Sequence, residues 1–192
     1  PGLTLRGSTY NVLRQPTLNE LYRPFVVFPV TTRANAALEN EALFGFEAGF
    51  DLALGSFELQ GTAFDNRVDG AIANVTIGPN LRERRNVDAV HSRGIELVGK
   101  ATVGRISWDG SLSLLDAQVE GSGASFALDG KRPAQVPIFA MSTTLSWRPA
   151  EGWLLSATLR HSSSQFEDDL ETDRLPAQTT LDAIATVPLT PR

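Results

Sequence analysis

The segment SWRPAEGWLLSATLR, residues 146–160, contains a turn with a tryptophan on each side. Trp147 comes just before the turn-forming residues 148–152, and Trp153 comes just after them. Apolar and polar residues alternate on both sides of the turn, which is the period of β-strands whose two faces meet different surroundings. The segment therefore predicts a β-hairpin with a large aromatic residue at each end of its turn. The fold depends on whether the apolar face of this hairpin meets lipid or the interior of a protein.

The same alternation recurs along most of the chain. Alternating runs lie at residues 2–12, 45–54, 57–63, 94–103, 108–114, 139–148, 153–160 and 181–187. These runs predict an all-β protein of about eight strands. Three residues interrupt the pattern, because Val98, Leu154 and Ile184 lie on the otherwise polar side of their runs.

Short and long connections alternate between the expected strands. The connections near 55–56, 104–107 and 148–152 are short, and those near 13–40, 70–86, 120–134 and 162–177 are long. In an antiparallel up-and-down sheet, alternate connections lie at opposite ends. One end with tight turns and the other with long loops is typical of a transmembrane β-barrel. A soluble β-sandwich is the alternative, because its strands also alternate where one sheet packs on the other.

All three tryptophans support the membrane interpretation. Trp108 occupies the same place in the preceding hairpin as Trp147 and Trp153 do in theirs, beside a short turn and on the apolar side. Amphipathic rings at one level form the aromatic girdle of a membrane interface. A barrel of eight strands has an interior filled by side chains. The long loops therefore favour a section of a larger barrel.

Composition excludes several other classes of protein. The chain has 192 residues, of which 42% are hydrophobic and 20% charged, so a disordered chain is excluded. The net charge of −5 gives no basis for a nucleic-acid partner. The sequence has no cysteine, hence no disulfide and no thiolate metal site. The chain opens on Pro1 and closes on a turn-like segment, 189–192, so we expect a fragment with two cut ends.

Residues 14–25, RQPTLNELYRPF, suggest a more specific assignment. Thr17 and Glu20 have the spacing of a helix capping box, which predicts a short helix at the start of an outer loop. The segment closely resembles the R-x-P-T-x-x-E-L motif of TonB-dependent outer-membrane receptors. Weaker matches to strands of that family follow in the family's order: 40–41 with 45–49, 63–66 with Asp69, Asn86 with 92–97, 130–137, and 175–182.

The resemblance covers nearly the whole chain and implies its architecture. It implies that residues 1–192 are about eight strands of a barrel of about 22, without the plug and without the terminal strands. The TonB box is also missing. In that family the plug fills the barrel, and the TonB–ExbB–ExbD complex acts through the plug. The TonB-coupled step therefore requires a part that this chain lacks.

The resemblance also implies a function. It implies a monomeric transport receptor in the outer membrane of a Gram-negative bacterium, in contact with outer-membrane lipid. Such a receptor imports a scarce small molecule, most simply a metal chelate such as a ferric siderophore, although cobalamin or an oligosaccharide is possible. No cofactor and no enzyme activity are expected. A passive porin-like barrel or a structural outer-membrane barrel remains the alternative.

A basic cluster in one long connection is the first candidate ligand site. Arg82, Arg84 and Arg85 surround Glu83 and could contact an anionic ligand or lipopolysaccharide phosphates. The simpler interpretation is a solvated cluster paired with itself. Two residues that follow the expected outer helix, Tyr22 and Arg23, are further candidates for ligand contact.

Charged residues on the polar side of the strands form a second set of candidates. The resemblance implies that they face the lumen of the barrel, where they pair with one another and with the plug. The set comprises Glu47, Glu96, Lys100, Arg148 and Arg160.

The remaining polar groups give no catalytic or metal site. His91 and His161 lie on the apolar side of different strands, so we expect interfacial histidines and no metal site. The serines 162–164 lack the G-x-S-x-G turn of a nucleophile. We expect the acidic segment 167–173 to be a solvated loop. Calcium is the alternative ligand, although the EF-hand pattern is absent.

Overall fold

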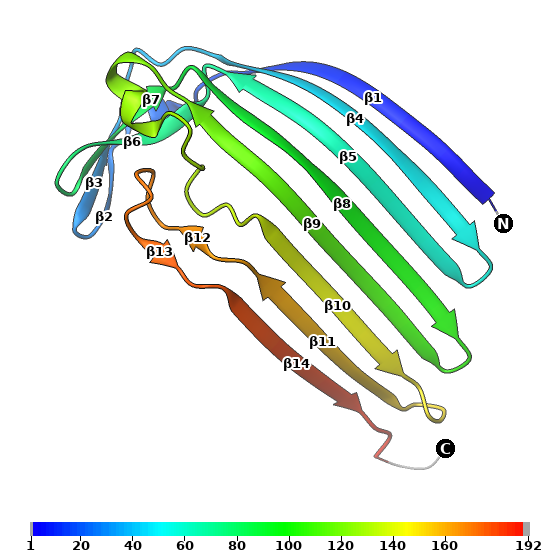
Figure 1. The fold of residues 1–192 in the computed structure, drawn as a ribbon. Coiled ribbons are helices and arrows are strands. Elements are labelled where there is room, and N and C mark those ends of the chain that lie inside the picture. The colour runs from blue at the N-terminus through cyan, green and yellow to red at the C-terminus, as the bar shows by residue number, and fades with distance from the viewer. Residues whose placement is uncertain (1, 190–192) are drawn as a thin grey trace.

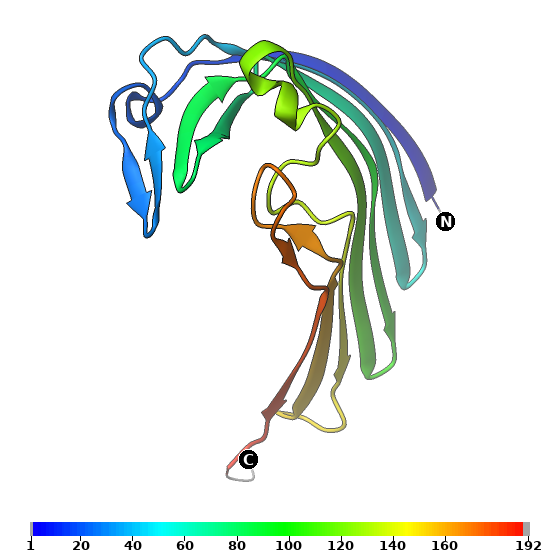
Figure 2. The same ribbon diagram turned by 60° about the vertical axis from the view of Figure 1, so that its left-hand side comes forward.

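The computed structural model describes residues 2–189, so the turn expected at 189–192 lies almost entirely outside this range. Eight strands form one antiparallel sheet in the order β1-β4-β5-β8-β9-β10-β11-β14 (Figure 1). Their bounds are β1 Gly2–Arg14, β4 Glu41–Leu54, β5 Phe57–Asp69, β8 Ala89–Val103, β9 Ile106–Glu120, β10 Phe139–Trp147, β11 Leu154–Ser162 and β14 Gln178–Thr186. The predicted all-β, up-and-down arrangement is confirmed. The sheet is curved but not closed, because β1 and β14 are its two edges (Figure 2).

The two ends of the sheet differ as the connection lengths predicted. At one end, β4 and β5 are joined through Gly55 and Ser56, and β8 and β9 through Gly104 and Arg105. Both glycines have positive φ, +63° and +58°, the left-handed backbone that tight hairpin turns require. The segment 148–153 joins β10 to β11 at the same end. All long connections leave from the other end (Figure 1).

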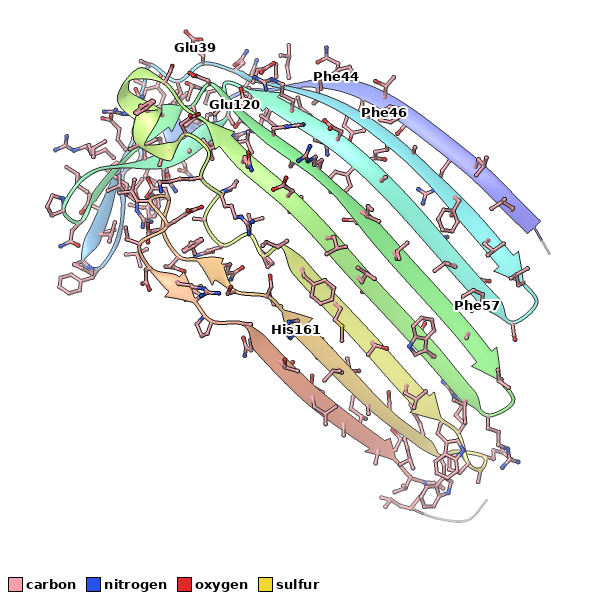
Figure 3. All side chains as sticks on the ribbon, viewed as in Figure 1. Glu39, Phe44, Phe46, Phe57, Glu120 and His161 are labelled. Atoms are coloured by element: carbon pink, nitrogen blue, oxygen red, sulfur yellow. The ribbon has the colours of Figure 1, made fainter. Side chains whose placement is uncertain are left out.

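The two faces of the sheet carry different side chains over most of its length. Residues paired across strands share a face, and the pairing places Ala63, Ile95 and Leu114 side by side on β5, β8 and β9. This face is the convex one. Figure 3 views it from outside and shows Phe44, Phe46 and Phe57 along it.

The long connections contain structure of their own. They form a helix, α1 Leu18–Tyr22, a 3-10 helix, η1 Gly123–Leu128, and six short strands: β2 Phe25–Val27, β3 Val30–Arg33, β6 Ile72–Gly78, β7 Leu81–Asn86, β12 Gln165–Phe166 and β13 Arg174–Leu175. Four of these strands pair as a second sheet, β2-β3-β7-β6. These elements overhang the concave side of the main sheet (Figure 2). The sequence analysis predicted long loops at 13–40 and 70–86, with a short helix in the first, but did not identify their strands. In β7, polar residues on both faces hide the strand period.

A small apolar core holds these loops on the main sheet. Val90 pairs with Val68 on one side and Val119 on the other, so three valines form a row on the concave face. The loop residues Val75 and Leu128, each only 2% exposed, pack in the same cluster. The loops are therefore anchored by burial of apolar surface.

At this level the convex face is charged. Asp65, Arg93 and Asp116 are paired across β5, β8 and β9, directly next to the apolar row Ala63, Ile95 and Leu114. On β5, β8 and β9 the two faces thus exchange: the convex face is apolar and the concave face polar near the tight turns, whereas near the loops the concave face is apolar and the convex face charged. The exchange also explains why β5, β8 and β9 extend beyond the predicted runs at the loop end, since their alternation changes phase there.

The helix α1 begins as the sequence predicted. The Thr17 hydroxyl accepts the backbone N–H of Glu20 at 3.3 Å, and the Glu20 carboxylate accepts the backbone N–H of Thr17 at 2.7 Å. Arg14 at the end of β1 pairs with Glu20 at 3.1 Å. Burial alone would raise the pKa of Glu20, but hydrogen bonds from Arg14 and Thr17 outweigh it and lower this pKa to about 2.

The loop core can be tested with an isosteric pair of variants in the whole receptor. Val119→Thr places a hydroxyl in the core, where Val119 is 6% exposed. We expect the loops to loosen by about 1–3 kcal/mol, because a buried hydroxyl loses its water partners. Faster proteolysis within residues 71–87 and 121–134 measures this effect. The control Val98→Thr, on the same face but 40% exposed, should change nothing. Equal proteolysis of both variants would contradict the core.

The α1 cap should weaken in acid. The folded pKa of Glu20 is about 2, below its usual value of 4.5, so the contribution of Glu20 to stability is present above pH 4.5 and is lost as the pH falls towards 2. Pepsin cleavage within residues 14–24 should therefore increase across this window. In Glu20→Gln, cleavage should already be raised and should vary less with pH. The exposed Glu151→Gln serves as control, and a wild-type profile identical to that of Glu20→Gln would contradict the prediction.

Candidate functional site

The loop elements over the concave face bring together the predicted ligand-binding residues. Tyr22 ends α1 and Arg23 is its C-cap, while Arg82, Arg84 and Arg85 lie on β7. The second sheet pairs β7 with β3 in parallel and with β6 antiparallel. The basic cluster therefore lies on an ordered strand and not in an irregular loop.

Arg84 has a structural position. It is 9% exposed, and its Nη1 donates to the backbone carbonyl oxygens of Asn19 and Arg23, the latter at 3.0 Å. Its guanidinium also lies 5.2 Å from the centre of the Phe25 ring. The guanidinium thus caps carbonyl groups at the end of α1, where the Asn19 oxygen also accepts the Arg23 backbone N–H at 3.1 Å. Arg84 thus joins α1 and β2 to β7.

The other members of the predicted set remain more accessible. Tyr22 is 67% exposed and Arg23 is also exposed, while Arg82 and Arg85 are half-buried. Arg85 pairs with Glu83, with Nε 2.7 Å from Oε2. Self-pairing of the cluster, the simpler sequence interpretation, therefore holds for Arg85. Ligand contact by any of these residues stays a prediction.

The tip of the β2–β3 hairpin is a feature that the sequence reasoning missed. Val26, Val27 and Phe28 are 64%, 67% and 92% exposed, although all three are apolar. The signal was present in the sequence as the apolar run FVVFPV, residues 25–30, inside an otherwise polar connection. An exposed apolar tip over the concave side enlarges the surface that the loops offer to a ligand.

Polar contacts cover the concave face near β1, β4 and β5. The Tyr10 hydroxyl lies 3.0 Å from Glu47 Oε1 and 2.7 Å from Asn66 Oδ1. In the next polar group along the strands, Arg6 pairs with Asp51 at 3.3 Å. Glu47 is therefore held by a neighbour in the same sheet.

The other predicted lumen charges share this face. In the strand register, Lys100 lies opposite Glu58 on β5 and opposite Asp109 on β9. Glu96 lies four residues before Lys100 on β8, on the same face. Arg160 forms an ion pair with Asp182 on β14. Arg148, just beyond β10, donates to Ser107 Oγ at 3.4 Å. All five predicted charges thus have their strand neighbours on the concave side, while pairing with a plug stays a prediction.

Two of the three tryptophans share the convex face. Trp147 pairs with Ile106, and Trp108 pairs with Leu145 between the same strands, β9 and β10. The Trp108 ring lies so close to Gly99 that an added Cβ would come within 2.7 Å of it, and its Nε1 donates to Thr143 Oγ1 at 2.8 Å. Trp153 lies one residue before β11 and is 40% exposed. The girdle role stays a prediction.

The acidic segment 167–173 differs from the solvated loop that was expected. The Asp168 carboxylate accepts the backbone N–H groups of Leu170, Thr172 and Asp173. Burial would raise the pKa of Asp168, but these bonds together hold it below its usual range. Asp169 accepts the backbone N–H of Thr76 at 2.7 Å.

The same segment also contacts the loop between β9 and β10. Glu171 accepts the backbone N–H of Arg132 at 2.8 Å, and Glu167 accepts Gln135 Nε2 at 3.0 Å. The carboxylates therefore join three loops to one another. Within residues 2–189, no group of three or more acidic, histidine or cysteine side chains has a spacing that could hold a metal ion.

The histidines lie apart on the convex face. His91 Nε2 is 2.8 Å from Asp65 Oδ1, and His161 Nδ1 is 2.8 Å from Thr179 Oγ1 on β14. His161 also stacks at an angle on Phe139, with 5.8 Å between ring centres.

In the described part of the chain, no helix is long and apolar enough to cross a membrane.

Comparison of the whole chain with known folds gives consistent neighbours. The structure resembles the ferric yersiniabactin uptake receptor FyuA from Yersinia pestis, with TM-score 0.70 and 13% identity over 94% of this chain and 27% of that one. It also resembles the ferric preacinetobactin receptor BauA from Acinetobacter baumannii (TM-score 0.69, 20% identity, 95% and 27%). The copper transporter OprC is a third neighbour (TM-score 0.72, 16% identity, 93% and 27%).

The chain therefore spans about a quarter of the length of these three structures, each of which it covers to 27%. No curated protein sequence matches it. The family model described as "TonB dependent receptor-like, beta-barrel" matches residues 1–192. The alternating strands, the order of the sheet and this match agree, and the chain belongs to the TonB-dependent receptor family, within its β-barrel domain.

Proposed function

We propose that this chain is a section of an active-transport receptor in the outer membrane of a Gram-negative bacterium. The receptor binds a scarce metal chelate, most simply a ferric siderophore, and imports it with energy transmitted by TonB. Family membership supports the TonB-coupled class. The neighbouring structures named as ferric yersiniabactin and ferric preacinetobactin receptors and as a copper transporter support a metal complex as cargo.

The main support for a membrane location is that apolar and polar side chains exchange faces along β5, β8 and β9. On β8, the convex positions are apolar from Val103 at the tight turn to Ile95, and the next convex position towards the loops is Arg93. This is about nine residues, close to the roughly 9–11 of a membrane-spanning strand. Lipid on the convex side near the turns, and water or headgroups near the loops, explains the exchange.

We further propose that residues 1–192 form part of a larger barrel of about 22 strands. The edge strands β1 and β14 have unpaired backbone groups on one side, and lipid does not tolerate such an edge. In the whole receptor these edges pair with further strands, and the plug supplies the contact with TonB–ExbB–ExbD. The receptor acts as a monomer.

Ligand capture belongs to the loop surface over the concave side. Tyr22 and Arg23 are its exposed polar candidates, and Arg82 lies two residues from Arg84 on the same face of β7. The apolar tip around Phe28 adds contact area. A chelate with an apolar body and negative charge matches this combination. Arg84 contributes indirectly, by keeping α1 in place.

The competing functions make different demands. A soluble β-sandwich requires a second sheet against the first along its length, whereas the second sheet here covers only the loop end (Figure 2). A passive porin-like barrel would take up solutes without TonB. No enzyme activity is proposed.

The membrane proposal predicts heat modifiability. The whole receptor should fractionate with the outer membrane and migrate faster in SDS gels before heating than after, because a closed barrel resists SDS. Heating above its unfolding temperature should restore the mobility expected from its mass. A soluble receptor with one mobility would contradict the proposal.

The ligand surface predicts which variants lose uptake. In a strain that depends on this receptor, uptake of radio-iron-labelled tris-catecholate and tris-hydroxamate chelates would be measured for Arg82→Ala, Tyr22→Ala and the control Arg105→Ala. We expect a severalfold loss for the first two and none for Arg105→Ala, which lies in a tight turn at the other end. Dissipating the proton gradient should abolish uptake, and uptake that continues would favour the passive alternative.

A further inference from the structure

The second sheet has two edges, and they differ. At β6 the edge is covered, because the Asp169 carboxylate accepts the backbone N–H of Thr76 at 2.7 Å and its hydroxyl at 2.6 Å. At the opposite edge, no strand within residues 2–189 pairs with the outer side of β2. The hairpin of β2 and β3 reaches over the concave side, farther from the main sheet than β6 and β7 (Figure 2). The edge of β2 therefore borders the space over the concave face.

The strand register identifies the backbone groups that this edge offers. Val26 lies opposite Thr31, and the Thr31 N–H donates to the Asn80 oxygen, on the β7 side of β3, at 2.9 Å. In an antiparallel pair, opposite residues exchange both of their hydrogen bonds or neither. Val26 and Thr31 exchange neither, so the N–H and C=O of Val26 both point away from β3. Val26 is 64% exposed, which leaves both groups open to a binding partner.

Two prolines limit the length of this edge. Pro24 comes directly before β2, and Pro29 lies two residues after its end, in the turn to β3. Proline has no N–H and cannot continue the hydrogen bonds of a strand ladder. Val26 is therefore the residue of β2 that presents both backbone groups outwards. A long strand of another protein would gain little here, whereas a short extended peptide can match the whole edge.

The side chains of the edge are apolar on both faces of the hairpin. Phe25 and Val27 lie on one face, 40% and 67% exposed, and Val26 lies on the other. Residues 24–30 contain no charged side chain. Proteins usually protect an edge strand with charges or a cover, so a bare apolar edge indicates a surface that pairs with a partner.

Positive charge lies at the base of the hairpin. Arg23 precedes β2 and Arg33 ends β3, and both side chains are exposed. Glu83, opposite Arg33 in the register, pairs with Arg85, and Glu20 is also held by an arginine. These carboxylates are thus neutralised by other residues. The charge left at the base of the hairpin favours an anionic group.

We propose that the edge of β2 binds the backbone of a short, extended peptide that forms part of the imported chelate, with an anionic end towards Arg23 and Arg33. This inference rests on the proposed function and names the class of its ligand, a metal chelate built on a peptide. The peptide adds to the hairpin as a further strand. One of its C=O groups accepts the Val26 N–H, and one of its N–H groups donates to the Val26 C=O.

The experiment uses the whole receptor purified in detergent and two synthetic ferric chelates as probes. The first is a linear peptide with three hydroxamate side chains and a free C-terminal carboxylate. The second is the same peptide with N-methylated backbone amides, so the iron-binding groups and the charge are unchanged. Equilibrium dialysis with radio-iron measures both affinities. We expect wild type to prefer the unmethylated peptide about tenfold, because methylation removes the donor that bonds to Val26.

Two variants separate the backbone of Val26 from its side chain. Val26→Pro spares the hairpin, because the Val26 N–H makes no bond to β3, but the proline ring takes the place of that N–H. We expect roughly fivefold weaker binding of the unmethylated peptide and loss of most of the preference between the two peptides. The control Val26→Thr keeps the N–H and the branched shape, so both affinities should stay unchanged.

Hydrogen exchange in the wild-type receptor gives a readout that does not depend on a variant. The bound peptide should slow exchange of the Val26 amide, whereas the Thr31 amide is already bonded to Asn80 and should not change. The charge is tested with Arg33→Gln, which should weaken binding of the carboxylate peptide severalfold and binding of its C-terminal amide form much less.

Failure of the proposed function is distinguishable from failure of this inference. Equal affinity of wild type for the two peptides, binding of neither peptide, or an unchanged Val26 amide would overturn the peptide site. A receptor that also imports non-peptide chelates in a TonB-dependent manner would then keep its proposed function. A receptor that is absent from the outer membrane and imports no chelate would sink both.

Discussion

The side chains on the two faces of β5, β8 and β9 change character along the strands, and the rest of the structure depends on that change. The backbone does not change along β8, so only the choice of side chains can adapt it. Near the tight turns the convex positions are apolar, and near the loops they are charged. The concave positions change in the opposite sense, from Glu96 and Lys100 to Val90. In the proposed membrane setting, β5, β8 and β9 are thus each built like a membrane strand in one part and like a strand of a water-soluble sheet in the other.

The loop end of the main sheet explains why the loops have a defined shape. Because the row Val68, Val90 and Val119 is apolar, the loops must cover it, and Val75, Val87 and Leu128 do so. Arg84 then joins α1 to the second sheet, and the acidic segment 167–173 joins the remaining loops. The ligand-facing surface proposed above is therefore supported from beneath by apolar packing and from the sides by hydrogen bonds.

The alternation of side chains was enough to predict the eight main strands, their order and the two kinds of connection, because period two persists wherever the two faces of the sheet carry different side chains. The helix start at Thr17 was also predictable, since its cap depends on residues close in sequence. The strand prediction was incomplete where the alternation of polar and apolar side chains shifts by one residue or is absent. The alternation of β5, β8 and β9 changes phase at Asp65, Arg93 and Asp116, and β7 is polar on both faces. The buried role of Arg84 depends on Asn19 and Phe25, far away in sequence, so no pattern around residue 84 could reveal it.

The acidic segment 167–173 has a consequence for how such a protein can vary over generations. Its carboxylates fit Thr76 in one loop and Arg132 and Gln135 in another. An insertion in any one of these loops would displace carboxylates that the other two require. A change in the length of one of these loops is therefore expected to be tolerated only when the others change with it, so that the loops vary in length as a matched set.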